Sequence, residues 1–445
     1  MNAVILAHGI GGRSDLPVPL WMALYGAGAA VVVSFAVLGA FWRNPKLEDT
    51  GAGRPLPLGL QRLVEAPATT AILRAAGLLA ALAVLLVAAV GPDPATSNFA
   101  PTWVYVWFWV GLVPASLLLG PVWKALNPLR ALSWIKARMT GVKEEPEHSL
   151  PAWLGYWPAA GGLAAFVWLE LVYQDAAKPV TVLIFLLLYG LVQLIGASYF
   201  GMRWYERCDG FEVYSTLVGR LCPFGRRDDG RLVVRNPLRG LAGLEPGPGL
   251  VAVVAVLLGS TGFDGLSRPT AWTDLTQDAS VISALLIGTA GLASAIAFVA
   301  LTFYVAIASS RKFARSANDR SAHGLPGRFV HSLVPIVIGY TVAHYFSLLV
   351  FQGQAGYILA SDPLGGGQNL FGTADWAINY TAVSTSVIAL VQVGAIVIGH
   401  VVGVVSAHDR AVGVFSGRNK TRGQYSLLAV MVAYSVGGIA LLVGT

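Results

Sequence analysis

The sequence has little charge and almost no cysteine. Only 12% of its 445 residues are charged, whereas a soluble domain carries roughly 25%. Its two cysteines, Cys208 and Cys222, are too few for a disulfide framework and have no histidine nearby that would complete a zinc site. The motifs G-x-S-x-G, H-x-H and H-E-x-x-H are also absent. The low charge argues against a soluble domain, and no familiar catalytic signature marks a site.

The sequence is instead rich in long apolar segments, and 55% of its residues are hydrophobic. Ten segments approach the length needed to cross roughly 30 Å of hydrocarbon at about 1.5 Å per residue. Lipid offers no partner for backbone N–H and C=O groups, so these segments must be helical. We predict an all-α integral membrane protein, with a single polytopic domain over residues 20–443 and spans at 20–42, 69–90, 102–120, 151–174, 180–202, 248–263, 280–308, 329–352, 382–406 and 424–443.

The basic residues are distributed very unevenly among the connections between these segments. Of the 30 Lys and Arg residues, 27 fall in or beside every second connection, and the other connections hold only Arg13, Lys178 and Arg268. The positive-inside rule makes the basic connections cytoplasmic, so both termini are expected outside and 203–247 is the longest cytoplasmic loop. The net charge of +7 then indicates anionic inner-leaflet lipid as the partner, and not nucleic acid.

The N-terminal arm, residues 1–19, carries two candidate site residues, His8 and Asp15. Residues 1–7 end on a small residue, as secretory signals do, but lack a basic start. Two interpretations remain open: a remnant of a signal peptide, or an arm that crosses with the first helix. Cleavage after position 7 would give His8 a free amine beside its imidazole, a pair able to bind a metal. The alternative is a solvated leader.

The acidic residues expected on the outer face are all aspartates. Eight Asp against three basic residues make this face electronegative, which suits a divalent metal in an oxygen-rich site. Asp264, Asp274 and Asp278 lie closest together along the chain and are the candidate ligands of one such ion. The alternative is that these residues serve turns and helix caps.

Ionisable and polar side chains inside the apolar segments are costly and therefore candidates for function. Glu170, His344 and Gln392 lie in the outer halves of their segments, and we expect them to approach one another in the bundle interior. His400 lies lower in its segment. By residue count His344 is roughly 21 Å and His400 roughly 9 Å above the inner end, which argues against a haem clamped between them. The alternative is hydrogen bonding between helices.

Four further segments carry predictions. Residues 353–380 form a long outer connection, and we expect it to fold as a lid with Trp376 or Phe371 pointing into the bundle. The tetrapeptide Asn-Pro-Leu-Arg occurs at 127–130 and 236–239, where Asn at the N-cap and Pro at N1 predict helix starts. The first leads into a basic amphipathic helix, and residues 211–221 predict a second interfacial helix.

Several segments resemble one family of membrane proteins. They are the arm HGIGGRSDLPVP, the stretch NFAPTWVYVWFWVGLVPASLLLGPVWKALNPLRAL, and the segments LELVYQD, AHYFSLLVFQGQ, ASDPLGGG and GHVVGVVSAHDRA. Together they are similar to multi-pass proteins of high-GC, actinobacterial-type bacteria that commonly carry the name fenitrothion hydrolase, an organophosphate hydrolase. The resemblance spans nearly the whole chain. It implies a protein of the bacterial plasma membrane that hydrolyses lipophilic phosphotriesters.

Hydrolysis of this kind needs metal-activated water or an activated nucleophile. His8, Asp15, Glu170 and His344 are the candidate catalytic residues, and Gln392, His400 and Trp376 are candidates for a substrate or polar site. The alternatives are a transporter or metal-handling component that uses the same residues, or a structural subunit of a membrane complex. Discontinuous helices would favour transport.

Overall fold

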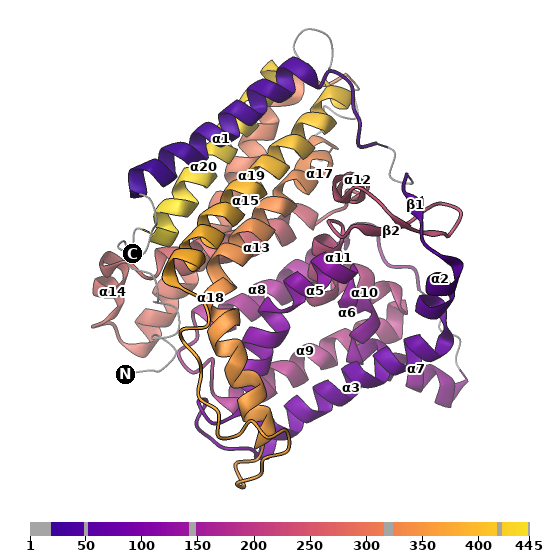
Figure 1. Ribbon diagram of the computed structural model, residues 1–445, viewed down its shortest axis with the longest axis vertical. Coiled ribbons are helices and arrows are strands. Elements are labelled where there is room, and N and C mark those ends of the chain that lie inside the picture. Colours follow the sequence, from indigo (N-terminus) through magenta and orange to yellow (C-terminus); the bar gives the residue numbers. More distant parts are fainter. Residues whose placement is uncertain (1–18, 49–51, 142–147, 316–323, 416–420, 444–445) are drawn as a thin grey trace. The chain divides into compact units, whose positions relative to one another are not determined.

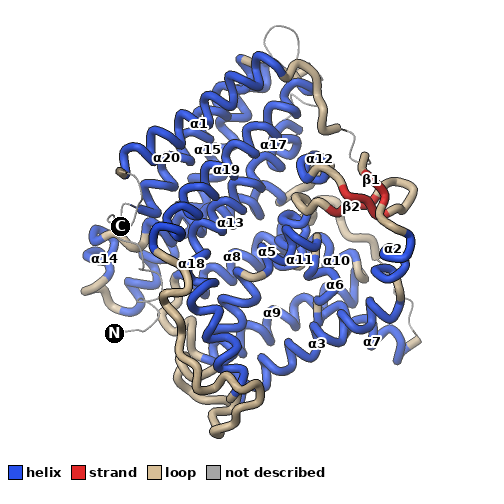
Figure 2. The backbone as a smooth tube through the Cα atoms, in the orientation of Figure 1, coloured by secondary structure: helices blue, strands red, loops and turns tan. Residues whose placement is uncertain are grey.

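The computed structural model describes residues 19–48, 52–141, 148–315, 324–415 and 421–443 (Figure 1). This part of the chain is predominantly helical, as predicted, with three short strands added (Figure 2). Eight of its helices are long and apolar enough to cross a membrane, or nine if the bent pair α13–α14 is one span. The described residues divide into two compact units: unit 1 lies within 52–237 and 347–383, and unit 2 within 19–48, 238–346 and 384–443.

Unit 1 is built around α3, α9 and the span formed by α4, η2 and α5, in which η2 is a π-helix. Short helices α6, α7, α10 and α11 pack among them. In chain order the helices of unit 1 are α2 (Leu58–Glu65), α3 (Pro67–Val90), α4 (Phe99–Thr102), η2 (Trp103–Val110), α5 (Leu112–Leu119), α6 (Val122–Leu126), α7 (Pro128–Thr140), α8 (Trp157–Leu171), α9 (Pro179–Phe200), α10 (Arg203–Cys208) and α11 (Gly210–Gly219).

A small antiparallel sheet also belongs to unit 1. Its central strand β3 (Leu232–Val234) pairs with β1 (Arg54–Pro55) on one side and β2 (Phe224–Arg226) on the other. Val234 is opposite both Arg54 and Phe224. The all-α prediction therefore holds for the long segments, and two segments predicted as loops form this sheet.

Unit 2 is a bundle in which α1 contacts α19 and α20, and α15 contacts α13 and α20 (Figure 1). Its helices are α1 (Leu20–Phe41), α12 (Pro237–Ala242), α13 (Leu250–Leu266), α14 (Thr270–Thr276), α15 (Val281–Ser310), α17 (Gly324–Phe329), α19 (Thr385–Val414) and α20 (Tyr425–Val443), with 3-10 turns η3 (Arg311–Phe313), η4 (Val330–Leu333) and η6 (Arg422–Gln424). Helix α18 (Val334–Ser361) gives its first part to unit 2 and its last part to unit 1.

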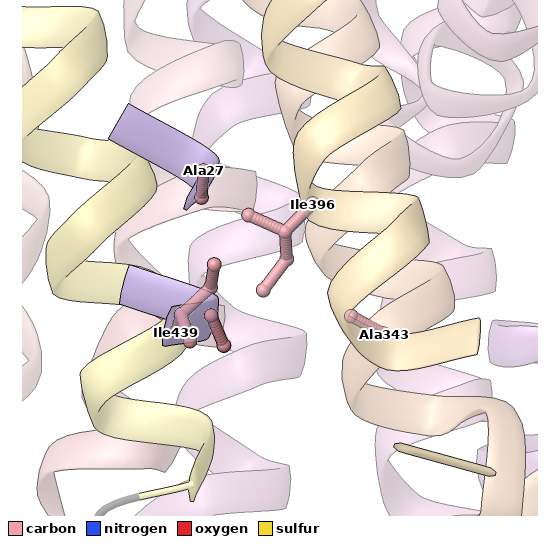
Figure 3. Close-up of a cluster of buried hydrophobic side chains, with 5 residues drawn as sticks. Ala27, Ala343, Ile396 and Ile439 are labelled. Carbon is pink, nitrogen blue, oxygen red and sulfur yellow. The ribbon is translucent and has the colours of Figure 1, made fainter. Parts of the chain in front are cut away.

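A cluster of small and branched side chains forms part of the core of unit 2 (Figure 3). Ala27 of α1, Ala343 of α18, Ile396 of α19 and Ile439 of α20 are each at most 2% exposed. The two alanines let the helix backbones approach closely around the two isoleucines, in the manner of helix packing within membranes. His344, the residue after Ala343, is thereby held on a packed helix.

The predicted span 151–174 is wrong in length. The helix there, α8, covers only 15 residues and is preceded by turns. Gly155 has φ +44°, a left-handed conformation that ends regular helix, and Pro158 stands in the first turn of α8, where a missing N–H costs nothing. The sixth predicted span, 248–263, corresponds to α13, which has 17 residues and is followed by an 87° bend into α14.

The predicted loop 353–380 begins too early. Helix α18 runs to Ser361, nine residues beyond the predicted end of its span. Trp107 of η2 packs against Gly356, where a Cβ atom would lie 1.9 Å from its indole nitrogen, and donates a hydrogen bond to the Gly353 carbonyl at 3.0 Å. Gly356, which lies in the segment predicted as a loop, thus makes room within a helix for the Trp107 side chain.

The predicted loop 203–247 is largely structured, with α10, α11, β2, β3 and α12. Helix α11 confirms the helix expected at 211–221 but is not interfacial, since nine of its ten residues are buried and it packs on α5, α6 and α8. Both Asn-Pro-Leu-Arg segments start helices as predicted, α7 at Pro128 and α12 at Pro237. Asn127 caps α7 by accepting from the Leu129 N–H at 3.0 Å.

Candidate functional site

The break between α13 and α14 places a carboxylate and a guanidinium on one side of unit 2. Almost every residue of α13 is buried, as expected of a helix that is apolar all round. Asp264 lies in its last turn, and Arg268 follows one turn later in the break. Pro269 cannot continue the helix and caps α14 instead, which produces the 87° bend.

His344 of α18 meets both of these side chains. Its Nε2 atom is in hydrogen-bond contact with Asp264 Oδ2 and lies 2.7 Å from Arg268 Nη2. Arg268 Nη2 also lies 3.5 Å from Asp264 Oδ2. The His344 and Asp264 side chains are 5% and 8% exposed, and that of Arg268 is 24% exposed. Three ionisable groups therefore share one nearly buried cluster, which we call the Asp264–His344–Arg268 cluster.

The chemistry of this cluster depends on one proton. A neutral imidazole has one N–H and one lone pair, so Nε2 can either donate to Asp264 or accept from Arg268, but not both. Donation to Asp264 leaves a polarised carboxylate–imidazole pair. Acceptance from Arg268 requires that Asp264 hold the proton itself. Transfer of the proton between the carboxylate and the imidazole therefore changes which of the two side chains, Asp264 or Arg268, is hydrogen-bonded to Nε2.

Aromatic side chains support the cluster. The Tyr345 ring lies 4.8 Å from the His344 ring in an edge-to-face arrangement. At the break, Trp272 packs edge-to-face on Phe263 at 5.3 Å and fills the space over Gly291, where a Cβ atom would lie 2.3 Å from its ring. These contacts fix the direction in which α14 leaves α13, and so the positions of Asp264 and Arg268.

The cluster partly matches the sequence expectations. His344 was expected to have a buried carboxylate partner, and it has one, but the partner is Asp264, which was expected as a metal ligand. Glu170 is half-buried near the end of α8 and belongs to unit 1. Gln392 is half-buried on α19. The convergence of Glu170, His344 and Gln392 stays a prediction.

His400 lies on α19, four residues after Ile396 of the core cluster. It is fully buried, with Nδ1 at 2.9 Å from the Ile396 carbonyl oxygen and its ring 5.8 Å from that of Tyr340. An Nδ1–H bonded to a backbone carbonyl directs the lone pair of Nε2 into the bundle. The role of His400 in a polar site stays a prediction.

The remaining candidates lie apart or beyond the described residues. Asp274 and Asp278 are exposed, on and just after α14, whereas Asp264 is buried on α13. Within the described ranges, no three His, Cys, Asp or Glu side chains are grouped as metal ligands would be. His8 and Asp15 lie outside the described residues. A divalent metal therefore stays a prediction.

The connection after α18 folds back on that helix within unit 1. Ser361 accepts from the Phe371 N–H at 2.9 Å, Thr373 donates to the Tyr357 carbonyl, and Trp376 packs edge-to-face on Tyr357 at 6.0 Å. Trp376 and Phe371 are 58% and 69% exposed, so neither is enclosed in a bundle. Residues 363–371 of this connection, including Phe371, line one part of an apolar groove of about 470 Å³, and α3, η2 and α18 line the rest.

Sequence reasoning missed two sets of polar residues. In sequence, Arg268 stood out only as one of three basic residues expected outside the membrane. In unit 1, a buried network joins Asn127 and Arg130 of the first Asn-Pro-Leu-Arg segment to Asp209 and Glu212. The repeated tetrapeptide was a signal for this network, because its Asn and Arg can do more than start a helix.

The comparisons give no relative from which a role could be carried over. The chain matches no family model, no curated protein and no solved structure.

Proposed function

We propose that this protein moves protons across the bacterial plasma membrane, with the Asp264–His344–Arg268 cluster as the proton-carrying site. One observation carries the proposal: three ionisable side chains lie together among apolar helices, at an 87° break between two helical segments. Buried ionisable groups in such helices usually mark ion or substrate pathways. Broken helices usually supply the binding site of a transporter.

The topology that we propose has ten crossings with both termini outside. It adds the short helix α8 and the bent pair α13–α14 to the eight long apolar helices. The alternation of basic connections supports this arrangement. The basic helix α7 then lies on the cytoplasmic side, where Lys136 and Arg138 would attract anionic lipid.

Cysteine labelling tests this topology. Cys208 and Cys222 are fully buried and should stay unlabelled on either side. We expect Gln368→Cys, on the exposed outer connection, to react with a membrane-impermeant maleimide in intact cells. Asp228→Cys, exposed in the loop between β2 and β3, should react only after the membrane is opened. The opposite pattern would invert the topology.

Proton movement through the cluster can be measured directly. The full chain is reconstituted into liposomes that contain a pH-sensitive dye, and a pH gradient is imposed. We expect the gradient to collapse faster than in empty liposomes, and Asp264→Asn and His344→Ala to return the rate to that of empty liposomes. His344→Gln should also fail, since an amide replaces the hydrogen bond but cannot carry the proton.

The matched control is His148→Ala, which removes an exposed histidine from unit 1 and should leave the rate unchanged. If Asp264→Asn and His344→Ala are both folded and both collapse the pH gradient at the wild-type rate, the proposed site is contradicted.

A second candidate function is hydrolysis of lipophilic phosphotriesters, as the family resemblance implies. The carboxylate–imidazole pair of Asp264 and His344 favours it, because such a pair can act as a general base toward water, with Arg268 beside it to stabilise charge on a phosphoryl oxygen. If this is the activity, fenitrothion should release its nitrophenol in the presence of the purified protein. His344→Ala should then lower the rate by about 10²-fold or more.

A further inference from the structure

A buried ion pair anchors the polar network of unit 1. Arg130 of α7 binds Glu212 of α11 through two hydrogen bonds, Nε to Oε2 and Nη2 to Oε1, each 2.6 Å. The two side chains are 7% and 1% exposed. This bidentate geometry matches the guanidinium fork to both carboxylate oxygens, so Glu212 is fully compensated.

Asp209, three residues before Glu212, is a second carboxylate and is completely buried. It caps α11 by accepting from the Phe211 N–H at 3.1 Å. It also accepts from the Tyr189 hydroxyl at 2.6 Å and from the Asn127 amide at 2.8 Å. All three donors are neutral, so its charge is solvated by dipoles alone.

The charges around Asp209 do not balance. Arg130 is the buried cation of the network, and two other carboxylates already engage it: Glu212 at 2.6 Å and Glu206 at 3.9 Å. Glu206 is 44% exposed and also pairs with Lys124 at 2.6 Å. A buried charge without a counter-ion is expensive, and a carboxylate in that position relieves the cost by taking up a proton. The titratable and charged groups that face Asp209 are Tyr189 of α9, Arg130 of α7, Tyr205 and Cys208 of α10, and Glu212 of α11.

We propose that Asp209 is a reversible proton-binding site, distinct from the cluster in unit 2, with Tyr189 and Asn127 as the groups that sense its protonation. Burial raises the pKa of Asp209 to about 6, against the lowering effect of the Tyr189 hydroxyl, with Glu212 raising it further. The site therefore changes state within the range of pH that a bacterial membrane experiences.

Proton uptake has a structural consequence. A neutral carboxylic acid is a weaker hydrogen-bond acceptor than a carboxylate, and a proton on Oδ2 would compete with the Asn127 amide N–H, so the bond from Asn127 to Asp209 weakens. The same amide lies 3.3 Å from Glu212 Oε2, and the Asn127 carbonyl oxygen caps α7. Protonation of Asp209 thus shifts the Asn127 amide toward Glu212 and loosens the link between the start of α7 and the start of α11.

Infrared spectroscopy of the full-length protein during a pH titration tests this site. On lowering the pH from about 8 to about 4.5, we expect the C=O band of a buried carboxylic acid to appear with a midpoint near 6. Asp209→Asn should remove this band. The matched control Asp229→Asn, at an exposed aspartate, should retain it. A wild-type band that survives in Asp209→Asn overturns the proposal.

A second variant keeps the test valid if Asp209→Asn does not fold. Tyr189→Phe removes a donor that favours the ionised carboxylate, so the midpoint should move to higher pH. An unchanged midpoint in Tyr189→Phe, or a wild-type midpoint in the ordinary range of an exposed aspartate near 4, overturns the proposal.

The same site predicts a dependence of stability on pH. The pKa of Asp209 is raised on folding, from 3.8 to about 6, so its stabilising contribution is complete below pH 3.8 and is lost as the pH rises through about 6. Between about pH 5 and about pH 8 we expect the melting temperature of the wild type to fall more than that of Asp209→Asn. Equal slopes in the two proteins would count against the proposal.

Discussion

Replacement of Arg130 by methionine should destabilise the protein by about 3–5 kcal/mol, because it leaves Glu212 buried with no counter-ion. The Glu212 side chain is 1% exposed and receives two hydrogen bonds from Arg130. Glu212→Met should cost a similar amount, since it leaves the buried guanidinium with only a longer ion pair, to Glu206 at 3.9 Å. The quantity to measure is the free energy of unfolding in detergent, from denaturant titration of the purified variants.

The double variant Arg130→Met/Glu212→Met separates the ion pair from simple packing. Removing both charges together is often neutral or even stabilising, so the double variant should recover most of the loss. Lys124→Met is the matched control, because it breaks an ion pair to Glu206 whose members are 49% and 44% exposed, and should cost only about 0–1 kcal/mol. A double variant as unstable as either single one would show that the pair matters for shape and not for charge.

Replacement of Gly77 by alanine should prevent α3 from packing on α6. A Cβ atom at Gly77 would lie 1.7 Å from the backbone carbonyl oxygen of Leu126, the last residue of α6. A backbone atom cannot turn aside as a side chain can, so the two helices must separate. We expect a loss of about 3 kcal/mol or more, at the upper end of overpacking effects, seen as a large fall in melting temperature.

Gly161→Ala is the matched control for this steric prediction. Gly161 lies in α8, and a Cβ atom there would meet nothing within 4 Å. Alanine is the better helix former by about 1 kcal/mol, so this variant should be neutral or more stable than the wild type. A melting temperature for Gly77→Ala equal to that of Gly161→Ala would mean that α3 and α6 are not in close contact in solution.

The long apolar helices were predictable because their ends follow local chemistry. Helices α1, α3, α9, α15 and α20 begin and end within two residues of the predicted spans. Each run of apolar residues is long enough to satisfy its own backbone as a helix, whatever its neighbours are. Proline in the first turn of α3 and α9, and glycine after both, mark the ends.

The prediction was wrong where a residue's role depends on a distant partner. Gly353 and Gly356 fall in the segment predicted as a loop, but Trp107 donates to the Gly353 carbonyl and packs over Gly356, and α18 continues. The residues of α11 read as one face of an interfacial helix, but α5, α6 and α8 cover nearly all sides of it. Composition gives the average environment of a segment, and these contacts are made by residues far away in the chain.

The candidate sites divide in the same way. The sequence by itself determined that the protein is a bundle of apolar helices and that His344, an ionisable group in such a helix, needs a partner, because an isolated charge among apolar groups is unstable. Asp264 was expected in an outer connection, as a metal ligand. Only the tertiary structure decided that Asp264 is the partner of His344 across 80 residues, with Arg268 beside them at the bend after α13. Likewise no sequence pattern singled out Asp209. Its burial, and the commitment of Arg130 to Glu212, exist only once α7, α9 and α11 have packed together, because burial and charge balance are properties of the assembled unit.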